Sequence, residues 1–234
     1  MDATVVVGRL RASKLFHGLG EGWLIRLAGE TRLVRFGENE YLWRAGSEAT
    51  HFTIIQRGLV QILQPTPGGE DSLLALFGPR ESVGDSAVME HGHYPADAVT
   101  ASETVEVLRV RAETVLAALP REPELAQALN RALLDHTRAL RAKITVMSAG
   151  TVPQRVATLL LHLADRFGDE DEKGHLWIPV PLSRGALSRL VGARVETVIR
   201  TVSRWQKDRL LTTTKDGFEI ESLEQLEALA RGSS

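Results

Sequence analysis

Charged side chains of the types that contact nucleic acids are concentrated between Ser183 and Lys215. This segment holds eight Lys or Arg against Glu196 and Asp208, a net charge of +6, whereas the formal net charge of the whole chain is −2. An arginine can donate two hydrogen bonds to the edge of guanine, and a glutamate can accept one from cytosine. Basic side chains and the N-termini of helices contact DNA phosphates. The segment therefore predicts a surface that binds double-stranded DNA.

The spacing of apolar residues shows how this segment would position its polar side chains. Ser183 can cap a first helix that buries Leu187 and Leu190, and Gly192 supplies a tight turn. A second helix follows, with apolar residues at i, i+3, i+7 and i+10, namely Val195, Val198, Val202 and Trp205. Its opposite face presents Arg194, Glu196, Thr197, Arg200 and Arg204.

This helix pair is typical of a helix-turn-helix domain, whose second helix enters the major groove of DNA. We expect Glu196 and Arg200 to read base edges. A second set is expected to contact phosphates and position the protein, namely Ser183, Arg184, Arg194, Thr197 and Arg204. A short strand and the sequence KDGFEI follow, and Asp216-Gly217 predicts a type I′ hairpin turn, so we expect a winged helix.

A long helix is predicted from about Glu122 to Ser148, where helix-forming residues dominate. A stripe with alternating spacings of three and four residues runs along it, and Lys143 falls in this repeat. The helix could pack on its own domain, but its length favours a two-chain coiled coil. The residues expected at this dimer seam are Leu129, Leu133, His136, Leu140 and Met147.

The sequence SAGTVPQ ends the long helix and begins the next one. Gly150 is expected to adopt the left-handed conformation, and Thr151 with Gln154 predicts a capping box. We therefore expect a hinge at Gly150 and Thr151.

The sequence pattern of the N-terminal half is typical of a β domain. Short runs rich in Val, Ile, Leu and Thr lie between about Leu33 and Val110, separated by glycines. Such spacing is typical of a sandwich or jelly roll. We expect an α+β protein with a β-roll sensor domain at 1–120, a dimerisation helix at 121–149 and a winged helix-turn-helix DNA-binding domain at 150–234.

The order of these parts, and the sequence GARVETVIRTVSRWQKDRLL, resemble the Crp/Fnr family of transcription regulators, named after the cyclic-AMP receptor and the fumarate-nitrate-reductase regulator. The resemblance implies an N-terminal domain like the cyclic-nucleotide-binding β-roll. It also implies a homodimer on a palindromic operator, with RNA polymerase as a further partner. By the same resemblance, Glu196 and Arg200 are the base-reading pair, and Ile199 lies between them, where its side chain could contact a thymine methyl group.

The cassette that holds cyclic nucleotides in this family would lie in ESVGDSAVMEHGHYPADAVTA. Gly84, Asp85 and Ser86 match its opening, but Pro95 and Ala96 stand where the family has an arginine followed by serine or threonine. The resemblance adds Tyr94, Leu140 and Arg141 to the expected effector pocket. We expect either a small-molecule effector that is not cyclic AMP bound in the usual way, or no effector; a cyclic nucleotide and haem remain the alternatives.

The composition excludes several classes of site. The chain has no cysteine, so cysteine-ligated iron–sulfur clusters, thiolate metal sites and disulfides are excluded. Histidines for haem exist at His17, His51, His91, His93 and His136. His91, His93 and Asp97 leave a metal-dependent cupin enzyme as a remote alternative, but we expect no enzyme. The N-terminus lacks a signal sequence and no stretch is long enough to span a membrane, so we expect a cytoplasmic protein.

Overall fold

A computed structural model describes residues 2–66, 71–90, 92–170 and 175–232 of the chain. These residues form two compact units, one from residues 2–66, 75–90 and 92–138 and the other from residues 71–74, 139–170 and 175–232. Antiparallel sheets and separate helices make up both units, which confirms the predicted α+β class.

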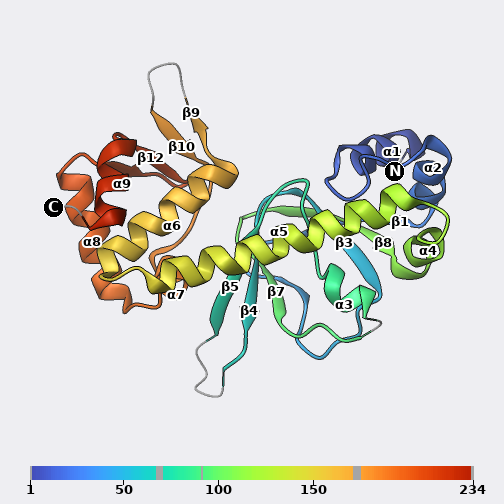
Figure 1. The fold of residues 1–234 in the computed structure, drawn as a ribbon, viewed down its shortest axis with the longest axis horizontal. Coiled ribbons are helices and arrows are strands. Elements are labelled where there is room, and N and C mark those ends of the chain that lie inside the picture. Colours follow the sequence, from blue (N-terminus) through green and yellow to red (C-terminus); the bar gives the residue numbers. More distant parts are fainter. Residues whose placement is uncertain (1, 67–70, 91, 171–174, 233–234) are drawn as a thin grey trace. The chain divides into compact units, whose positions relative to one another are not determined.

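Two four-stranded antiparallel sheets lie in the N-terminal half of the chain (Figure 1). One sheet has the order β1 (Thr31–Phe36), β8 (Val105–Arg111), β3 (His51–Arg57), β6 (Ser82–Val83). The other has the order β2 (Tyr41–Trp43), β7 (Asp97–Thr100), β4 (Val60–Gln64), β5 (Ser72–Phe77). The predicted β-roll is therefore confirmed.

Helices cover one face of the first sheet, because alternate residues of its strands are apolar. Phe52, Leu108 and Val110 are fully buried on this face. They share one core with residues of α1 (Ala3–Ala12), α2 (Glu21–Gly29), α4 (Ala112–Ala118) and the first turns of α5 (Pro123–Ser148). A short helix, α3 (Asp85–Met89), lies in the predicted sensor cassette.

The second unit contains the predicted helix pair, α7 (Arg184–Val191) and α8 (Val195–Lys207), together with α6 (Val152–Phe167) and α9 (Leu223–Arg231). Its sheet has the order β11 (Leu211–Thr213), β12 (Phe218–Ile220), β10 (Leu176–Ile178), β9 (Asp169–Glu170). Gly192 ends α7 with a φ of 59°, so the predicted turn glycine is confirmed.

The wing hairpin β11–β12 is present, but its predicted turn type was wrong. A type I′ turn needs a positive φ at both central residues, and Asp216 does not have one. The hydroxyl of Thr214 instead accepts hydrogen bonds from the amides of Asp216 and Gly217, at 3.1 Å each. These local hydrogen bonds from the backbone to a side chain stabilise a turn of a different type.

The link between α5 and α6 was predicted in part. Thr151 and Gln154 form the expected capping box. Gly150 does not adopt a left-handed conformation, so that prediction was wrong. A Cβ atom at Gly150 would lie 2.8 Å from the Gln154 side-chain oxygen, so this glycine provides space for the cap.

Among the described residues, none of the helices combines the length and apolar character that a membrane span requires.

Candidate nucleic-acid interface and ligand pocket

The helix α8 has one deeply buried side that holds it in place. Val198, Val202 and Trp205 are at most 5% exposed, and Thr201 lies with them and donates its hydroxyl hydrogen to the Thr197 carbonyl. Val195, expected on this side, is half-buried. The apolar base predicted for the second helix therefore exists, and it fixes which side chains face outward.

The outward side of α8, which we call the reading face, consists of Arg194, Glu196, Thr197, Ile199, Arg200 and Arg204. All are exposed except Thr197, which is half-buried. Ile199 is 43% exposed, which is unusual for a large apolar residue. A side chain of this kind can contact the methyl group of thymine.

Few contacts restrain the charged groups of the reading face. Arg200 Nη2 donates a hydrogen bond of 3.4 Å to Thr197 Oγ1, one helical turn earlier. Arg204 lies 3.5 Å from Asp208, a solvent-exposed ion pair that contributes little. Within the described part of the chain, no side chain caps the N-terminus of α8. The Thr197 amide donates to the Arg194 carbonyl, so the amides of Val195 and Glu196 are left to water or to a phosphate.

Two residues expected to contact phosphates also make structural hydrogen bonds within the domain. Ser183 caps α7, because its hydroxyl accepts a hydrogen bond from the Ala186 amide. Arg184 is half-buried and donates a hydrogen bond of 2.9 Å to Thr213 Oγ1 in the wing. Burial lowers the pKa of Arg184. Arg184 thus connects α7 to β11 through one of its donors, and its contact with a DNA phosphate stays a prediction.

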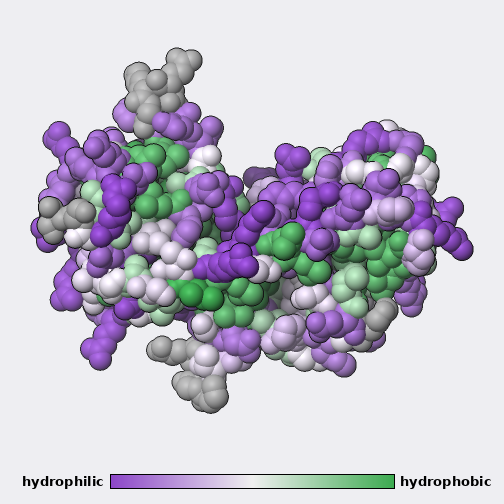
Figure 2. Space-filling view, in the orientation of Figure 1, coloured by the Kyte–Doolittle hydropathy of each residue, from purple (hydrophilic) through white to green (hydrophobic). Residues whose placement is uncertain are grey.

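The predicted seam residues of α5 are not all on one exposed stripe. Leu129 is 2% exposed and belongs to the core of the first unit, which corrects its assignment to the seam. Leu140 and Met147 are 49% and 41% exposed, and Leu133 is half-buried. Ile144 lies between Leu140 and Met147 and is 65% exposed. Figure 2 shows apolar and charged side chains alternating along the course of α5.

Two other members of the repeat form hydrogen bonds within the chain. His136 Nε2 lies 2.9 Å from the Ser82 carbonyl, which can only accept, so this nitrogen carries a hydrogen. Lys143 donates to the carbonyls of Arg189 and Leu190. The mixed polarity of the stripe, visible in the sequence, thus reflects intramolecular contacts.

An aromatic pair lies directly against the start of the sensor cassette. The rings of Trp43 and Tyr94 stack with centroids 4.0 Å apart. Gly84 precedes α3 with a φ of 81°, and a Cβ atom there would lie 2.7 Å from Tyr94 and 3.1 Å from Trp43. Trp43 Nε1 donates to the carbonyl of Ala96. The expected pocket residues Gly84, Tyr94 and Ala96 are therefore brought together, but they are packed on each other and on Trp43.

The remaining expected pocket residues differ in exposure and in the unit to which they belong. Ser86 is exposed on α3. Leu140 and Arg141 are exposed and belong to the second unit. Asp85 is fully buried and accepts a hydrogen bond from the Ser82 hydroxyl, and its carboxylate lies 3.8 Å from His136 Nε2. Asp85 is thus corrected from a ligand-facing residue to one that contacts α5.

The protonation of Asp85 has a predictable effect on stability. Burial raises the pKa of Asp85, while His136 and the Ser82 hydroxyl oppose this shift. Its Oδ1 atom has no hydrogen-bond partner among the described residues. The folded chain therefore takes up a proton more readily than the unfolded chain at pH values above 3.8, the ordinary value. The contribution of Asp85 to the free energy of unfolding therefore grows as the pH falls toward 3.8.

We expect the stability of the native chain, relative to an Asp85→Asn variant, to rise as the pH falls toward 3.8, the ordinary carboxyl value. The upper limit of the effect is about 1.4 kcal/mol per pH unit. Urea unfolding of both proteins at each pH measures the difference. Glu38→Gln, which changes an exposed carboxyl group, is the control and is expected to show no such trend. If the difference in unfolding free energy between the native chain and Asp85→Asn does not change with pH, the burial argument is contradicted.

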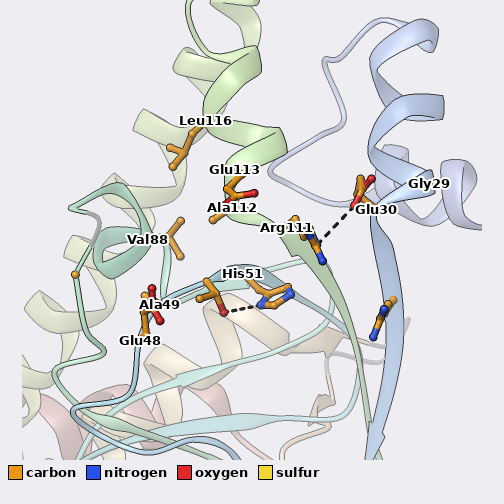
Figure 3. Close-up of a pocket in the computed structure, with 13 residues that line it drawn as sticks. Gly29, Glu30, Glu48, Ala49, His51, Val88, Arg111, Ala112, Glu113 and Leu116 are labelled. Carbon is orange, nitrogen blue, oxygen red and sulfur yellow. Dashed lines mark hydrogen bonds and ion pairs between the residues drawn. The ribbon is translucent and has the colours of Figure 1, made fainter.

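A cavity of about 820 Å³ lies beside the cassette in the first unit (Figure 3). Val88, Ala112 and Leu116 give its lining an apolar part, with Glu113 beside them, and His51 and Arg111 also line it. A second cavity of about 380 Å³, lined by Trp43, Tyr94 and Arg109 among others, shares His51 with the first. Both volumes are in the range that small-molecule sites occupy.

The wall of the larger cavity carries charges of both signs. Arg111 lies 3.7 Å from Glu30, and Thr50 hydrogen-bonds to His51 Nδ1 (Figure 3). Burial, and then the nearby arginines, lower the pKa of His51. The acidic side chains of the lining are Glu30, Glu48 and Glu113, and its basic ones are Arg32 and Arg111. Charge within this cavity is therefore nearly balanced.

The histidines considered for haem or a metal are dispersed. His17 Nδ1 lies 3.0 Å from the Lys14 carbonyl, and His51 and His136 are hydrogen-bonded as above. His93 is exposed, and His91 lies outside the described residues. Asp97 is buried, accepts a hydrogen bond from the Ala45 amide and lies 3.6 Å from Arg44. The part of the chain that the structure describes holds no group of three or more His, Cys, Asp or Glu positioned for a metal ion.

Sequence reasoning missed the roles of four residues at these sites. Trp43 lies on a strand far from the cassette in the sequence, so no local pattern points to it. Ile144 falls between two expected seam positions and could have been found from its apolar character on the same helical face. Lys143, expected only as a member of the repeat on α5, and Arg155, on α6, donate hydrogen bonds to carbonyls at the end of α7 through long, flexible side chains, which leave no signal in spacing.

Comparisons with known proteins agree with this architecture. The model of the cyclic nucleotide-binding domain matches residues 33–122, and that of the Crp-like helix-turn-helix domain matches residues 154–229. A CRP-like cAMP-activated global transcriptional regulator of Mycobacterium tuberculosis is 27% identical over 83% of this chain and 86% of its own length. The transcriptional activator protein FnrA of Stutzerimonas stutzeri is 29% identical over 84% of this chain and 79% of its own length.

Solved structures share the fold. FixK2 from Bradyrhizobium japonicum superposes with a TM-score of 0.72 at 19% identity, over 85% of this chain and 96% of its own. A CRP-family transcriptional regulator from Thermus thermophilus gives a TM-score of 0.69 at 22% identity, over the same shares of the two chains.

Proposed function

Because the chain belongs to the Crp/Fnr family of transcription regulators, we propose that it acts as a homodimer that binds a palindromic DNA operator. The observation that carries this proposal is the reading face of α8, where exposed Glu196, Ile199 and Arg200 stand over a buried apolar base. Glu196 and Arg200 read base edges, and Arg194, Thr197 and Arg204 contact the backbone. Arg184 and Ser183 hold the domain that presents them.

The proposal assigns residues 1–120 to the sensor domain, 121–149 to the dimerisation helix and 150–234 to DNA binding. Leu140, Ile144 and Met147 support the dimer, because they expose apolar surface at i, i+4 and i+7 of one helix. Two such stripes cover each other in a twofold pair. The proposal includes RNA polymerase as a partner, a cytoplasmic location and no enzymatic activity, in keeping with relatives that are named as transcription regulators.

Selection of bound duplexes from a random DNA pool tests this function most directly. We expect an enriched motif with two inverted half-sites, whose centres lie about one helical turn, or ~34 Å, apart. Failure to enrich any motif, with and without small metabolites from a cell extract, would contradict sequence-specific DNA binding. Enrichment of one unpaired half-site would contradict the homodimer alone.

The proposed effector differs from cyclic AMP bound in the family's usual way. Pro95 and Ala96 replace the residues that grip the cyclic phosphate in the family, and Pro95 has no amide hydrogen to offer. The stacked Trp43 and Tyr94 rings also lie against Gly84. These two observations favour another small molecule, for which the adjoining cavities offer space.

We expect calorimetry with cyclic AMP to detect no micromolar binding. The loss of a charge-assisted contact to the phosphate weakens affinity by about a hundredfold. Cyclic GMP is the matched control, because it carries the same cyclic phosphate on a different base. A micromolar dissociation constant for cyclic AMP would show that the aromatic pair and Pro95-Ala96 still admit the ligand.

A further inference from the structure

The C-terminal end of α7 is held by two basic side chains from the helices before it. Lys143 Nζ, on α5, donates hydrogen bonds of 2.9 Å and 2.6 Å to the carbonyls of Arg189 and Leu190. Arg155 Nη1, on α6, donates to the carbonyls of Val191 and Gly192 at 3.2 Å and 3.4 Å. Four consecutive carbonyls are therefore bound by two cations.

These carbonyls are the ones that a helix leaves without partners. The last four carbonyls of an α-helix have no amide one turn ahead, and they carry the negative end of the helix dipole. Gly192 and Ala193 both donate to the carbonyl of Ser188, so the carbonyls that follow Ser188 are left to other donors. Lys143 and Arg155 supply them.

The same two residues connect this end of α7 to the link between α5 and α6. Arg155 also donates through Nε to the carbonyl of Ala149 at 3.1 Å and through Nη2 to that of Gly150 at 3.3 Å. Met147 packs on the turn itself, since a Cβ atom at Gly192 would lie 2.5 Å from its methyl carbon. The segment around Gly150, expected to be a hinge, is thus braced against α7.

We infer that Lys143 and Arg155 are positioning residues for the DNA-reading helix. Gly192 and Ala193 lead directly from the bound end of α7 into Arg194 and the start of α8. A displacement of the loop between α7 and α8 therefore also displaces Glu196 and Arg200, which lie on the first two turns of α8. The inference rests on the proposed function, because it concerns how the reading face is held for DNA.

The environment of Lys143 supports a role beyond general packing. Desolvation lowers the pKa of Lys143 to about 8, so the fold keeps this ammonium group where burial opposes its charge. An apolar side chain of similar length would have no charge to desolvate at this position. The two carbonyl contacts explain why a cation is placed there.

The test compares the DNA affinity of variants on the best duplex selected with the native protein. Lys143→Met and Arg155→Met retain apolar stems but remove the donors, and each is expected to weaken operator affinity about tenfold. Lys143→Arg and Arg155→Lys restore a cation and are expected to recover most of that loss. Arg131→Met, an exposed position on α5, is the control and should bind as the native protein does.

Salt dependence separates positioning from direct contact with DNA. We expect Lys143→Met and Arg155→Met to leave the slope of log K against log salt unchanged, because neither residue contacts a phosphate. Arg204→Met, on the reading face, should reduce that slope by about one unit. A reduced slope for Lys143→Met would make Lys143 a phosphate contact and overturn the inference.

The remaining outcomes are also decisive. Circular dichroism and thermal unfolding establish that each variant is folded, and Lys143→Met with its arginine rescue suffices if Arg155→Met does not fold. A folded Lys143→Met variant with native affinity overturns the inference and leaves the proposed function intact. A native protein that binds no duplex contradicts the proposed function itself.

Discussion

Ile144→Glu is expected to convert the proposed dimer into monomers and to lower affinity for a two-half-site operator by about a thousandfold. Ile144 is the most exposed large apolar residue among the described ones, at 65%, and Leu140 and Met147 flank it one turn away on either side. At a twofold seam the variant would place two carboxylates against each other, with little water to screen them. Each monomer would then bind one half-site without help from a linked partner.

Light scattering and fluorescence anisotropy on the selected operator measure the two effects together. Leu134→Glu is the matched control, because Leu134 is 50% exposed on the same helix but lies on another face. Ten residues separate it from Ile144, and ten residues are not a whole number of helical turns. A dimeric Ile144→Glu protein that still binds both half-sites would refute the proposed seam.

Arg200→Ala is expected to cost about 1–3 kcal/mol of operator binding and to relax base preference at one position of each half-site. The side chain is exposed, and its hydrogen bond to Thr197 orients the guanidinium along α8. A bidentate contact from this group to guanine cannot be replaced by alanine or by water with the same selectivity. Affinity for random duplexes should change much less.

Repeating the DNA selection with the variant identifies which position loses its preference. Arg204→Ala serves as the comparison, since a lost phosphate contact weakens all sequences about equally and reduces the salt dependence. If Arg200→Ala keeps the native motif, another residue reads that base. Glu196 would then be the next residue to vary.

The sequence alone was sufficient for the architecture and for the reading face. The net charge between Ser183 and Lys215, the apolar spacing of Val198, Val202 and Trp205, and the turn glycine Gly192 are local features. Helix periodicity and capping chemistry depend on neighbours a few residues apart, so they can be recognised along the chain. The capping box of Thr151 and Gln154 was predicted for the same reason.

Tertiary structure decided which polar side chains are free to act. Arg184 has the type and place of a phosphate-binding residue, and Thr213, far along the chain, accepts a hydrogen bond from one of its donors. Asp85 matches a ligand-binding position, but it is buried near His136. Trp43 fills space at Gly84 from a distant strand, and Lys143 and Arg155 hold carbonyls that no spacing reveals. Side-chain partners are set by packing between segments remote in sequence, and that information is absent from any local pattern.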